Sequence, residues 1–524
     1  MGKFKNSFQL ESGQVPGKFN HPFISPAPDR IAIIAEDPVP GKFADLFSNV
    51  PDRPGLARDY KDIFEGIAKS LSDAGFNSCI LCNVFEVMEA LADSAEKKGI
   101  SSIVSTGYVY DSAEHSYGLL DMYENRSQPV GFKVMDEPLY NDWGDVLHFL
   151  NDSEARKTPP ETWNDLTKGF RMMTTLFPDR LPFFTLAVPE INDKVGVNYP
   201  KAKPMLGSCT TYEEYLDVLQ RLYKPGVWIY DFYPFLLDKK PALNNPETGD
   251  ITNGQNVIIR YRDFYSYLDI FSKHARKTGR PFFAYCMCEG HGQLSGNEFE
   301  WYQPVPTAGM LRFEAFSALA YGAQGIVYWQ YGKGEYNDGQ KLVFEEAPLS
   351  IEISDESTSG SSPDSNVPVD ISRIKLKYHT ELWNAVAQVN LEINKLSPIF
   401  LGCSVLKILH YHTADKTDEA FPVSSISGSS SEEYAGIRIM NLPGTSVLLS
   451  EIVNYTKKYL VVVSHYPFKS QRVSFILDSG RRYVIRMPEV DDSQVVVGSG
   501  ASAYHSRELI PGGYMIIESI NLHP

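Results

Sequence analysis

Short apolar runs recur along the first two thirds of the chain, and each is followed by a stretch of mixed polarity. The runs are rich in β-branched and aromatic residues, a composition typical of strands that are buried on both faces. They occupy residues 31–35, 76–83, 102–106, 130–135, 182–188, 227–232, 281–287 and 325–330. The pattern predicts eight strands of one largely parallel sheet.

Between these runs, apolar residues recur at helical spacing. Helices are predicted at residues 57–74, 84–98, 162–176, 210–223, 261–277, 311–321 and 373–395, and the weakest unit lies around 113–124. Eight strand–helix units in about 350 residues predict a (β/α)₈ TIM barrel, an α/β fold. A doubly wound open sheet is the structural alternative. Residues 335–366 are acidic and rich in serine, and they are predicted to form a long loop after the eighth strand.

Near residue 397 the pattern changes to an alternation of apolar and polar residues, with a period of two. Short alternating runs separated by Gly, Pro, Ser and Asp predict a C-terminal antiparallel β-sandwich. The predicted division is an irregular lead-in over residues 1–28, a barrel over 29–396 and a β-sandwich over 397–524. The last part is interpreted as a supporting domain or, alternatively, as a sugar-binding module.

Composition narrows the classes of partner. The chain of 524 residues carries a net charge of −16, which disfavours nucleic acid and anionic membrane surfaces. No apolar run approaches the roughly 20 residues of a membrane span. The N-terminal residues lack an apolar segment, so we expect a periplasmic or secreted location if a signal peptide was removed and a cytoplasmic one otherwise. Oligomeric state is not indicated.

The six cysteines fall mostly within apolar runs. The spacings Cys79-x-x-Cys82 and Cys286-x-Cys288 are compatible with metal or redox sites. Neither pair lies in a Gly-rich knuckle, and neighbouring residues of a strand point to opposite faces. Buried structural thiols are the alternative, and no cofactor is predicted.

Two predicted strands end on a glutamate. The fourth runs into Asp136 and Glu137 and is stopped by Pro138, while the seventh ends at Glu289, before a glycine. In a (β/α)₈ barrel the active site lies at the C-terminal ends of the strands, so these carboxylates are predicted to share one opening. Two carboxylates at one opening are what hydrolysis of a glycosidic bond requires.

Other polar and aromatic residues follow the same strand ends. We expect them to bind substrate, with Trp329 stacking on a sugar ring and Asp136 orienting a sugar hydroxyl. Each has a structural alternative, such as rim packing or a buried ion pair. A metal cluster is a further alternative, although no typical ligand spacing supports it. The candidate substrate-binding residues are Asp136, Tyr230, Asp231, Tyr233, His291, Trp329 and Tyr331.

These strand ends resemble those of clan A glycoside hydrolases, and residues 311–329 are similar to the seventh helix and eighth strand of family 42-type β-galactosidases. The resemblance implies Glu137 as acid/base, Glu289 as nucleophile, Tyr233 as hydrogen-bond donor to the nucleophile and Trp329 under the sugar. Two features depart from it. Asp136 stands where the clan usually has Asn, and the surroundings of Glu289, Cys-Glu-Gly-His-Gly, are not typical of its nucleophile.

The sequence therefore predicts a retaining glycosidase that cleaves β-linked oligo- or polysaccharides. A catalytically degenerate barrel that binds glycans without cleaving them is the alternative from another class. A metal-dependent barrel enzyme such as a lyase is a third. The sugar, the linkage and the choice between exo and endo action are not indicated.

Overall fold

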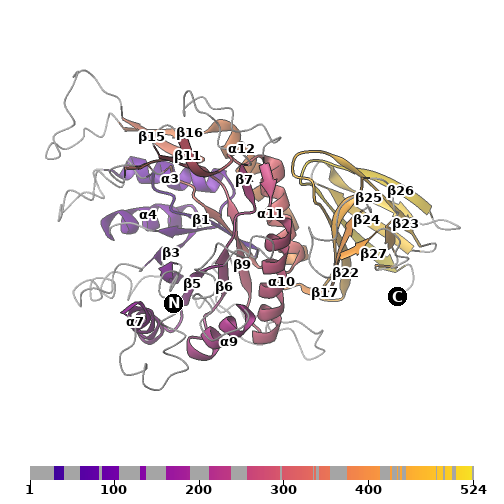
Figure 1. The fold of residues 1–524 in the computed structure, drawn as a ribbon, viewed down its shortest axis with the longest axis horizontal. Helices are drawn as coiled ribbons and strands as arrows, with labels where there is room; N and C mark the ends of the chain where they lie inside the picture. Colours follow the sequence, from indigo (N-terminus) through magenta and orange to yellow (C-terminus); the bar gives the residue numbers. More distant parts are fainter. Residues whose placement is uncertain are drawn as a thin grey trace.

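The chain was analysed as a computed structural model (Figure 1). It describes residues 29–40, 60–81, 85–105, 130–136, 161–188, 212–237, 257–295, 298–333, 335–337, 341–353, 374–412, 425–427, 433–434, 437–439, 444–478, 481–487, 490–497 and 503–521. The predicted lead-in of residues 1–28 and the weak helix around 113–124 lie outside these residues.

Eight parallel strands close into a barrel, which confirms the predicted sheet and excludes the open alternative. Their order around the barrel is β1-β12-β9-β6-β5-β4-β3-β2, so each strand lies beside its neighbour in chain order and the first pairs with the last. The strands are β1 (Ala32–Glu36), β2 (Ser78–Leu81), β3 (Ser101–Ser105), β4 (Gly131–Asp136), β5 (Leu181–Ala187), β6 (Trp228–Asp231), β9 (Phe282–Met287) and β12 (Gly325–Trp329).

Alternating residues of each strand enter two different cores. In β1, Ala32 and Ile34 belong to the cluster that fills the barrel, whereas Ile33 packs with the surrounding helices. This alternation explains the continuous apolar runs in the sequence, because both faces of each strand are buried. It also sets which polar side chains near a strand end can reach the interior.

Helices surround the barrel (Figure 1). The helix α11 is buried on every side, because the barrel strands lie on one side and the C-terminal sheets on the other. The helix α10 ends at Gly279, which adopts a left-handed conformation (φ 66°) that glycine tolerates without strain. The described helices are α3 (Lys61–Asp73), α4 (Phe85–Lys97), α7 (Glu161–Leu176), α9 (Tyr212–Leu222), α10 (Tyr261–Thr278), α11 (Ala308–Ala320) and α12 (Thr380–Phe400).

Several strands lie outside the barrel, and the prediction of a long loop over residues 335–366 is wrong in its first half. That half contains three strands, and a further strand precedes α12, where helix was predicted. Pairing between distant segments overrides the local polar composition there, because β14 pairs with β10. The added strands are β7 (Phe235–Leu237), β8 (Val257–Ile259), β10 (Gly290–Ser295), β11 (Glu298–Gln303), β13 (Glu335–Asn337), β14 (Lys341–Glu346), β15 (Leu349–Ile353) and β16 (Ile374–Tyr378).

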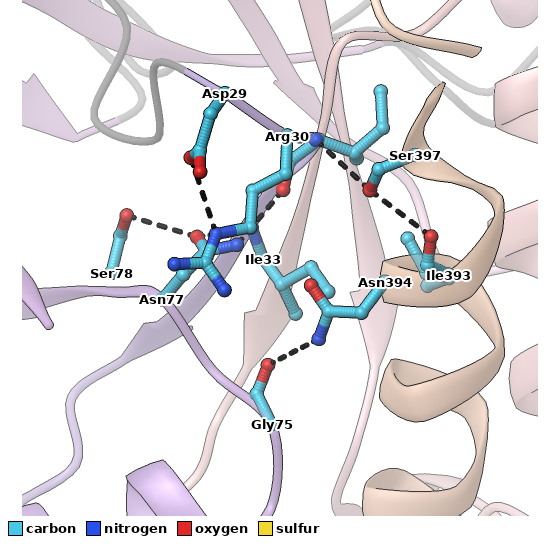
Figure 2. A network of polar contacts seen from close by, with 10 residues as sticks. Asp29, Arg30, Ile33, Gly75, Asn77, Ser78, Ile393, Asn394 and Ser397 are labelled. Carbon is cyan, nitrogen blue, oxygen red and sulfur yellow. Dashed lines mark hydrogen bonds and ion pairs between the residues drawn. The ribbon is translucent and has the colours of Figure 1, made fainter. Parts of the chain in front are cut away.

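The N-terminal end of the barrel is tied together by side-chain amides and hydroxyls (Figure 2). The side chain of Asn77 accepts from the backbone of Ile33 at 2.9 Å and donates to the carbonyl of Ile31 at 2.9 Å. The backbone of Ile31 in turn donates to Ser397 of α12 at 3.2 Å. These bonds join the starts of two strands to the last helix, so this end of the barrel is a structural one.

The C-terminal part forms a seven-stranded and a four-stranded sheet with mostly antiparallel pairing, and residues of both sheets share one core. Its description as a β-sandwich stays a prediction. The strands are β17 (Ser404–His412), β18 (Ser425–Ser427), β19 (Glu433–Tyr434), β20 (Ile437–Ile439), β21 (Ser446–Asn454), β22 (Lys457–Ser464), β23 (Gln471–Leu477), β24 (Arg481–Met487), β25 (Val490–Val497), β26 (Ala503–Leu509) and β27 (Tyr514–Asn521).

This part packs directly on the barrel helices. The ring of Phe316 in α11 stacks on Tyr514 with 3.7 Å between ring centroids, and Ser450 donates to the carbonyl of Ala320 at 2.6 Å. Within the described residues, no helix combines the length and the apolar character needed to cross a membrane.

Candidate active site at the C-terminal end of the barrel

The strand count that placed the two glutamates agrees with the barrel. In chain order β4 is the fourth barrel strand and β9 the seventh, and all eight run in parallel. The C-terminal ends of β4 and β9 therefore lie at the same end of the barrel. The strand β4 ends at Asp136, and Glu137 lies outside the described residues. The side chains of Asp136 and His291 are likewise outside the described part.

Glu289 lies two residues beyond β9 and has no exposed surface. Its neighbours are held closely on both sides. The backbone of Cys288 donates to the carbonyl of Trp329 at 2.8 Å, and a Cβ at Gly290 would lie 2.5 Å from a methyl group of Val305. Glycine is therefore required after Glu289 by close packing, and the position of this carboxylate is determined by the ends of β9 and β12.

Tyr233 follows the sixth barrel strand and borders the interior core. Arg260 secures its loop, since its guanidinium donates to the carbonyl of Tyr233 at 2.5 Å and lies over the ring of Phe232 at 4.4 Å. Burial raises the pKa of Tyr233 well above its usual value, and the charges of Asp231 and Glu289 act in the same direction. The hydroxyl of Tyr233 therefore stays protonated and is able to donate to a carboxylate.

Trp329 ends β12 and, like Tyr233, is a partly buried residue against the interior core. The peptide bond between Trp329 and Gln330 is cis. The side chain of Gln330 donates to Asp37 at 3.3 Å, which links the ends of the eighth and first strands. Trp329 and Tyr233 thus both present aromatic rings against the interior core. Asp231 ends the sixth strand and interacts electrostatically with Tyr233.

Two predicted substrate-binding residues lie among the helices instead. Tyr230 stacks on Phe271 of α10 with 4.2 Å between ring centroids, and the hydroxyl of Tyr331 accepts from the indole of Trp383 in α12 at 3.0 Å. Tyr230 faces the helices because side chains alternate between the two faces of a strand. Its neighbours Ile229 and Asp231 therefore point to the opposite, inward face, where Ile229 belongs to the interior core. Both tyrosines are buried in the packing around the barrel, at 2% and 0% exposure.

A polar network that was not predicted from the sequence lies inside the barrel. Lys133 of β4 forms an ion pair with Glu36 of β1, and the hydroxyl of Tyr285 in β9 donates to the same carboxylate. Thr185 of β5 lies 3.2 Å from the Tyr285 hydroxyl. Two signals were present in the sequence: a glutamate at the end of the first apolar run and a lysine within the fourth.

A second buried polar group lies behind β9. Burial raises the pKa of Glu314 in α11 well above its usual value, which favours the neutral carboxyl group, and a hydrogen bond with the backbone of Met287 opposes this shift only in part. Burial also raises the pKa of the Cys286 and Cys288 thiols well above their usual value. Both thiols are free, and in this protonated state they are poor nucleophiles and poor metal ligands.

Potential metal ligands are not gathered in the described residues, where no group of three or more His, Cys, Asp or Glu side chains is placed to hold an ion. The described side chains near the opening are a buried carboxylate, a protonated tyrosine hydroxyl, an ion-paired carboxylate and a partly buried indole.

The chain matches no family model and no curated protein sequence. It is similar to the solved structures of three enzymes. A GH30 endoxylanase from Clostridium papyrosolvens C71 has 10% identity and a TM-score of 0.31, with 94% of this chain and 96% of that chain covered. An endo-β-1,4-mannanase from Thermotoga petrophila has 9% identity and a TM-score of 0.31, with 95% and 96% covered. An endo-β1,6-glucanase has 9% identity and a TM-score of 0.37, with 96% and 93% covered.

Likenesses at identities and TM-scores this low carry no argument about activity or site residues. The specific resemblance to family 42-type β-galactosidases stays a prediction, since none of these three structures belongs to that group by name.

Proposed function

We propose that this chain is a retaining glycoside hydrolase that cleaves β-glycosidic bonds, with Glu289 as the nucleophile and Glu137 as the acid/base. The observation that carries the proposal is the setting of Glu289. This carboxylate follows the seventh strand of a closed parallel barrel and interacts electrostatically with a tyrosine hydroxyl that stays protonated. A carboxylate beside a hydroxyl donor is favoured in its charged form, which a nucleophile requires.

In the proposed first step, Glu137 protonates the oxygen of the departing sugar while the Glu289 carboxylate attacks the anomeric carbon. The bond to the leaving group breaks as the glycosyl–Glu289 ester forms. In the second step, Glu137, now ionised, takes a proton from water, and the water oxygen displaces Glu289. The two inversions leave the anomeric configuration unchanged.

Tyr233 and Trp329 have supporting roles in this proposal. We infer that the Tyr233 hydroxyl donates to Glu289 once substrate is bound and orients it toward the anomeric carbon. Trp329 presents its ring to the apolar face of the sugar, as a partly exposed aromatic group on the interior core is able to do. Neither residue exchanges a proton with the substrate.

The direct test is covalent trapping. The full chain is incubated with a panel of aryl 2-deoxy-2-fluoroglycosides, which slow breakdown of the glycosyl-enzyme, and the labelled peptide is identified by mass spectrometry. We expect one sugar per chain, attached to Glu289. Glu289→Gln should remain unlabelled, while Glu352→Gln, which alters an exposed glutamate of β15, should be labelled as the wild type is.

Label on another residue would reject Glu289 as the nucleophile. Glycan binding without label or hydrolysis, measured by calorimetry with natural β-linked polysaccharides, would favour the degenerate binding barrel instead. Activity that is lost on chelation and restored by a divalent ion would favour the metal-dependent enzyme.

A further inference from the structure

A hydrogen bond from Tyr285 connects the buried ion pair inside the barrel to β9, the strand that leads to the proposed nucleophile Glu289. Lys133 and Glu36 have side chains that are 2% and 1% exposed, and they connect β4 to β1 across the interior. Tyr285 donates a hydrogen bond to Glu36 from β9, the strand that leads to Glu289. The pair therefore belongs to the floor beneath the opening.

Three carboxylates from the ends of different strands act electrostatically on Tyr233. Tyr233 interacts electrostatically with Asp231 of β6, Glu36 of β1 and Glu289 beyond β9, and also with the Tyr285 hydroxyl. Buried carboxylates that are close together disfavour each other's charged form, because each negative charge raises the pKa of the others. Glu289 must be ionised to attack, so the charge on Glu36 opposes the proposed chemistry unless it is offset.

We propose that Lys133 is a positioning residue whose ammonium group offsets the charge of Glu36 and thereby lets Glu289 remain ionised at the opening. This inference rests on the proposed function. Lys133 acts through Glu36 and does not touch the substrate in this scheme. Lys133 lies on β4 and reaches Glu36 of β1 across the barrel interior. It thereby brings a positive charge to a site with several carboxylates.

The described titratable groups around the pair come from four parts of the barrel. Glu36 faces Lys133 of β4 and Tyr285 of β9, while Asp231 and Tyr233 approach from the end of β6. Beside Glu289, the thiol of Cys288 is kept neutral, because burial raises its pKa. The described charged groups near Tyr233 and Glu36 thus include the carboxylates, Lys133 and the Arg260 guanidinium, which donates to the carbonyl of Tyr233.

A charge-swap series tests the proposal. The protein is labelled with glutamate carrying ¹³C at the side-chain carboxyl, and the Glu289 and Glu36 signals are assigned by their loss in Glu289→Gln and in Glu36→Gln. Carboxyl shifts are then followed from pH 3 to pH 9 in the wild type, Lys133→Gln, Glu36→Gln and the double variant.

We expect opposite shifts in the two single variants. The midpoint of Glu289 should rise by roughly one pH unit in Lys133→Gln and fall by a similar amount in Glu36→Gln, as a charge change at an effective dielectric near 20 would cause. In the double variant, which keeps the local charge balance, the midpoint should return to the wild-type value. Shifts of the same sign in both single variants, or no shift in either, would overturn the proposal.

Each single variant leaves one buried charge without its partner and is therefore more prone to misfold than the double variant, which removes both charges. If only the double variant folds, the pH dependence of the Glu36 signal in the wild type tests the proposal instead. A Glu36 carboxylate that stays ionised at neutral pH supports the proposal, and a protonated one refutes it.

Kinetics separate this inference from the proposed function. The acid limb of the pH profile of kcat/KM on an aryl glycoside should move with the Glu289 midpoint in each variant. Opposite midpoint shifts together with an unmoved limb would leave the charge coupling in place and count against Glu289 as nucleophile. If the wild type had no glycosidase activity, the proposed function would be rejected. The carboxyl titration would still show whether the charges of Lys133 and Glu36 shift the midpoint of Glu289.

Discussion

Two buried ion pairs of similar exposure lie in different surroundings. Arg312 of α11 and Glu392 of α12 form a forked pair with N–O distances of 2.9–3.1 Å, and Gln388 donates to the same carboxylate at 3.4 Å. Their side chains are 6% and 7% exposed. This pair joins two helices outside the barrel, and its two charges are matched with each other by a planar, bidentate geometry.

The pair of Lys133 and Glu36 has a different environment. Its cation is a single ammonium group, its carboxylate also accepts a hydrogen bond from Tyr285, and that carboxylate acts on Tyr233 together with Asp231 and Glu289. A point charge with rotatable donors suits a site whose charge balance matters more than its geometry. Burial and pairing are common to both ion pairs, so only the charges around each pair distinguish the two.

The largest effect is expected at the opening itself. Glu289→Gln removes the proposed nucleophile while keeping its size, so kcat/KM on an aryl glycoside should fall by roughly 10⁴-fold or more. The urea midpoint should change little beside that loss. Steady-state kinetics and a denaturation curve on the same preparation check this, and activity within tenfold of the wild type would contradict the assignment.

The ion pair of Arg312 and Glu392 should instead affect stability and leave activity unchanged. Arg312→Met leaves Glu392 buried without its cation, which should lower the free energy of unfolding by about 3–5 kcal/mol. At temperatures where the variant is folded, kcat/KM should stay near the wild-type value. Urea denaturation measures the first effect. The double variant Arg312→Met, Glu392→Leu should recover most of the stability, and a comparable loss of kcat/KM in it would remove the contrast between the two pairs.

Tyr233 tests whether the opening depends on a hydroxyl donor. Tyr233→Phe keeps the ring and removes the hydroxyl, and loss of one such donor to a reacting group should lower kcat by roughly 10²-fold. Because burial and nearby carboxylates raise the pKa of Tyr233, the wild-type profile should show no decline from this group up to pH 9. An unchanged kcat in Tyr233→Phe would exclude the proposed contact.

A smaller effect is expected from the neutral carboxyl behind β9. Burial raises the pKa of Glu314 in the folded chain, so folding takes up a proton above the pH at which Glu314 ionises in the unfolded chain. Stability should therefore be highest below about pH 4 for this group and should fall as pH rises toward its folded pKa, by about 1.4 kcal/mol per pH unit.

Glu314→Gln removes this dependence, because the amide does not titrate. Urea denaturation at pH 5 and pH 7 should show a smaller decrease for the variant than for the wild type. Parallel decreases in the two proteins would mean that Glu314 is ionised in the folded state, and the contrast with the charged floor of the barrel would then be lost.

Much of the barrel was predictable because its strands are buried on both faces and read as continuous apolar runs. Counting those runs placed Glu289 after the seventh strand, in agreement with the closed sheet. The strands of residues 335–353 were not predictable from local composition, since β14 pairs with β10, some 50 residues away, β13 pairs with β14, and β15 pairs with β16. Local composition carries no information on such a partner.

The amino-acid sequence by itself determined the repeating units, and thereby the end of the barrel at which Glu289 lies. Only the tertiary structure decided which side chains face inward. It turned Tyr230 and Tyr331 toward the helices and left Tyr233 and Trp329 against the interior core. It also joined Lys133 to Glu36 across 97 positions of the chain. The reason is physical: side-chain direction and pairing depend on strand register and barrel closure, which arise only when all eight strands are in place.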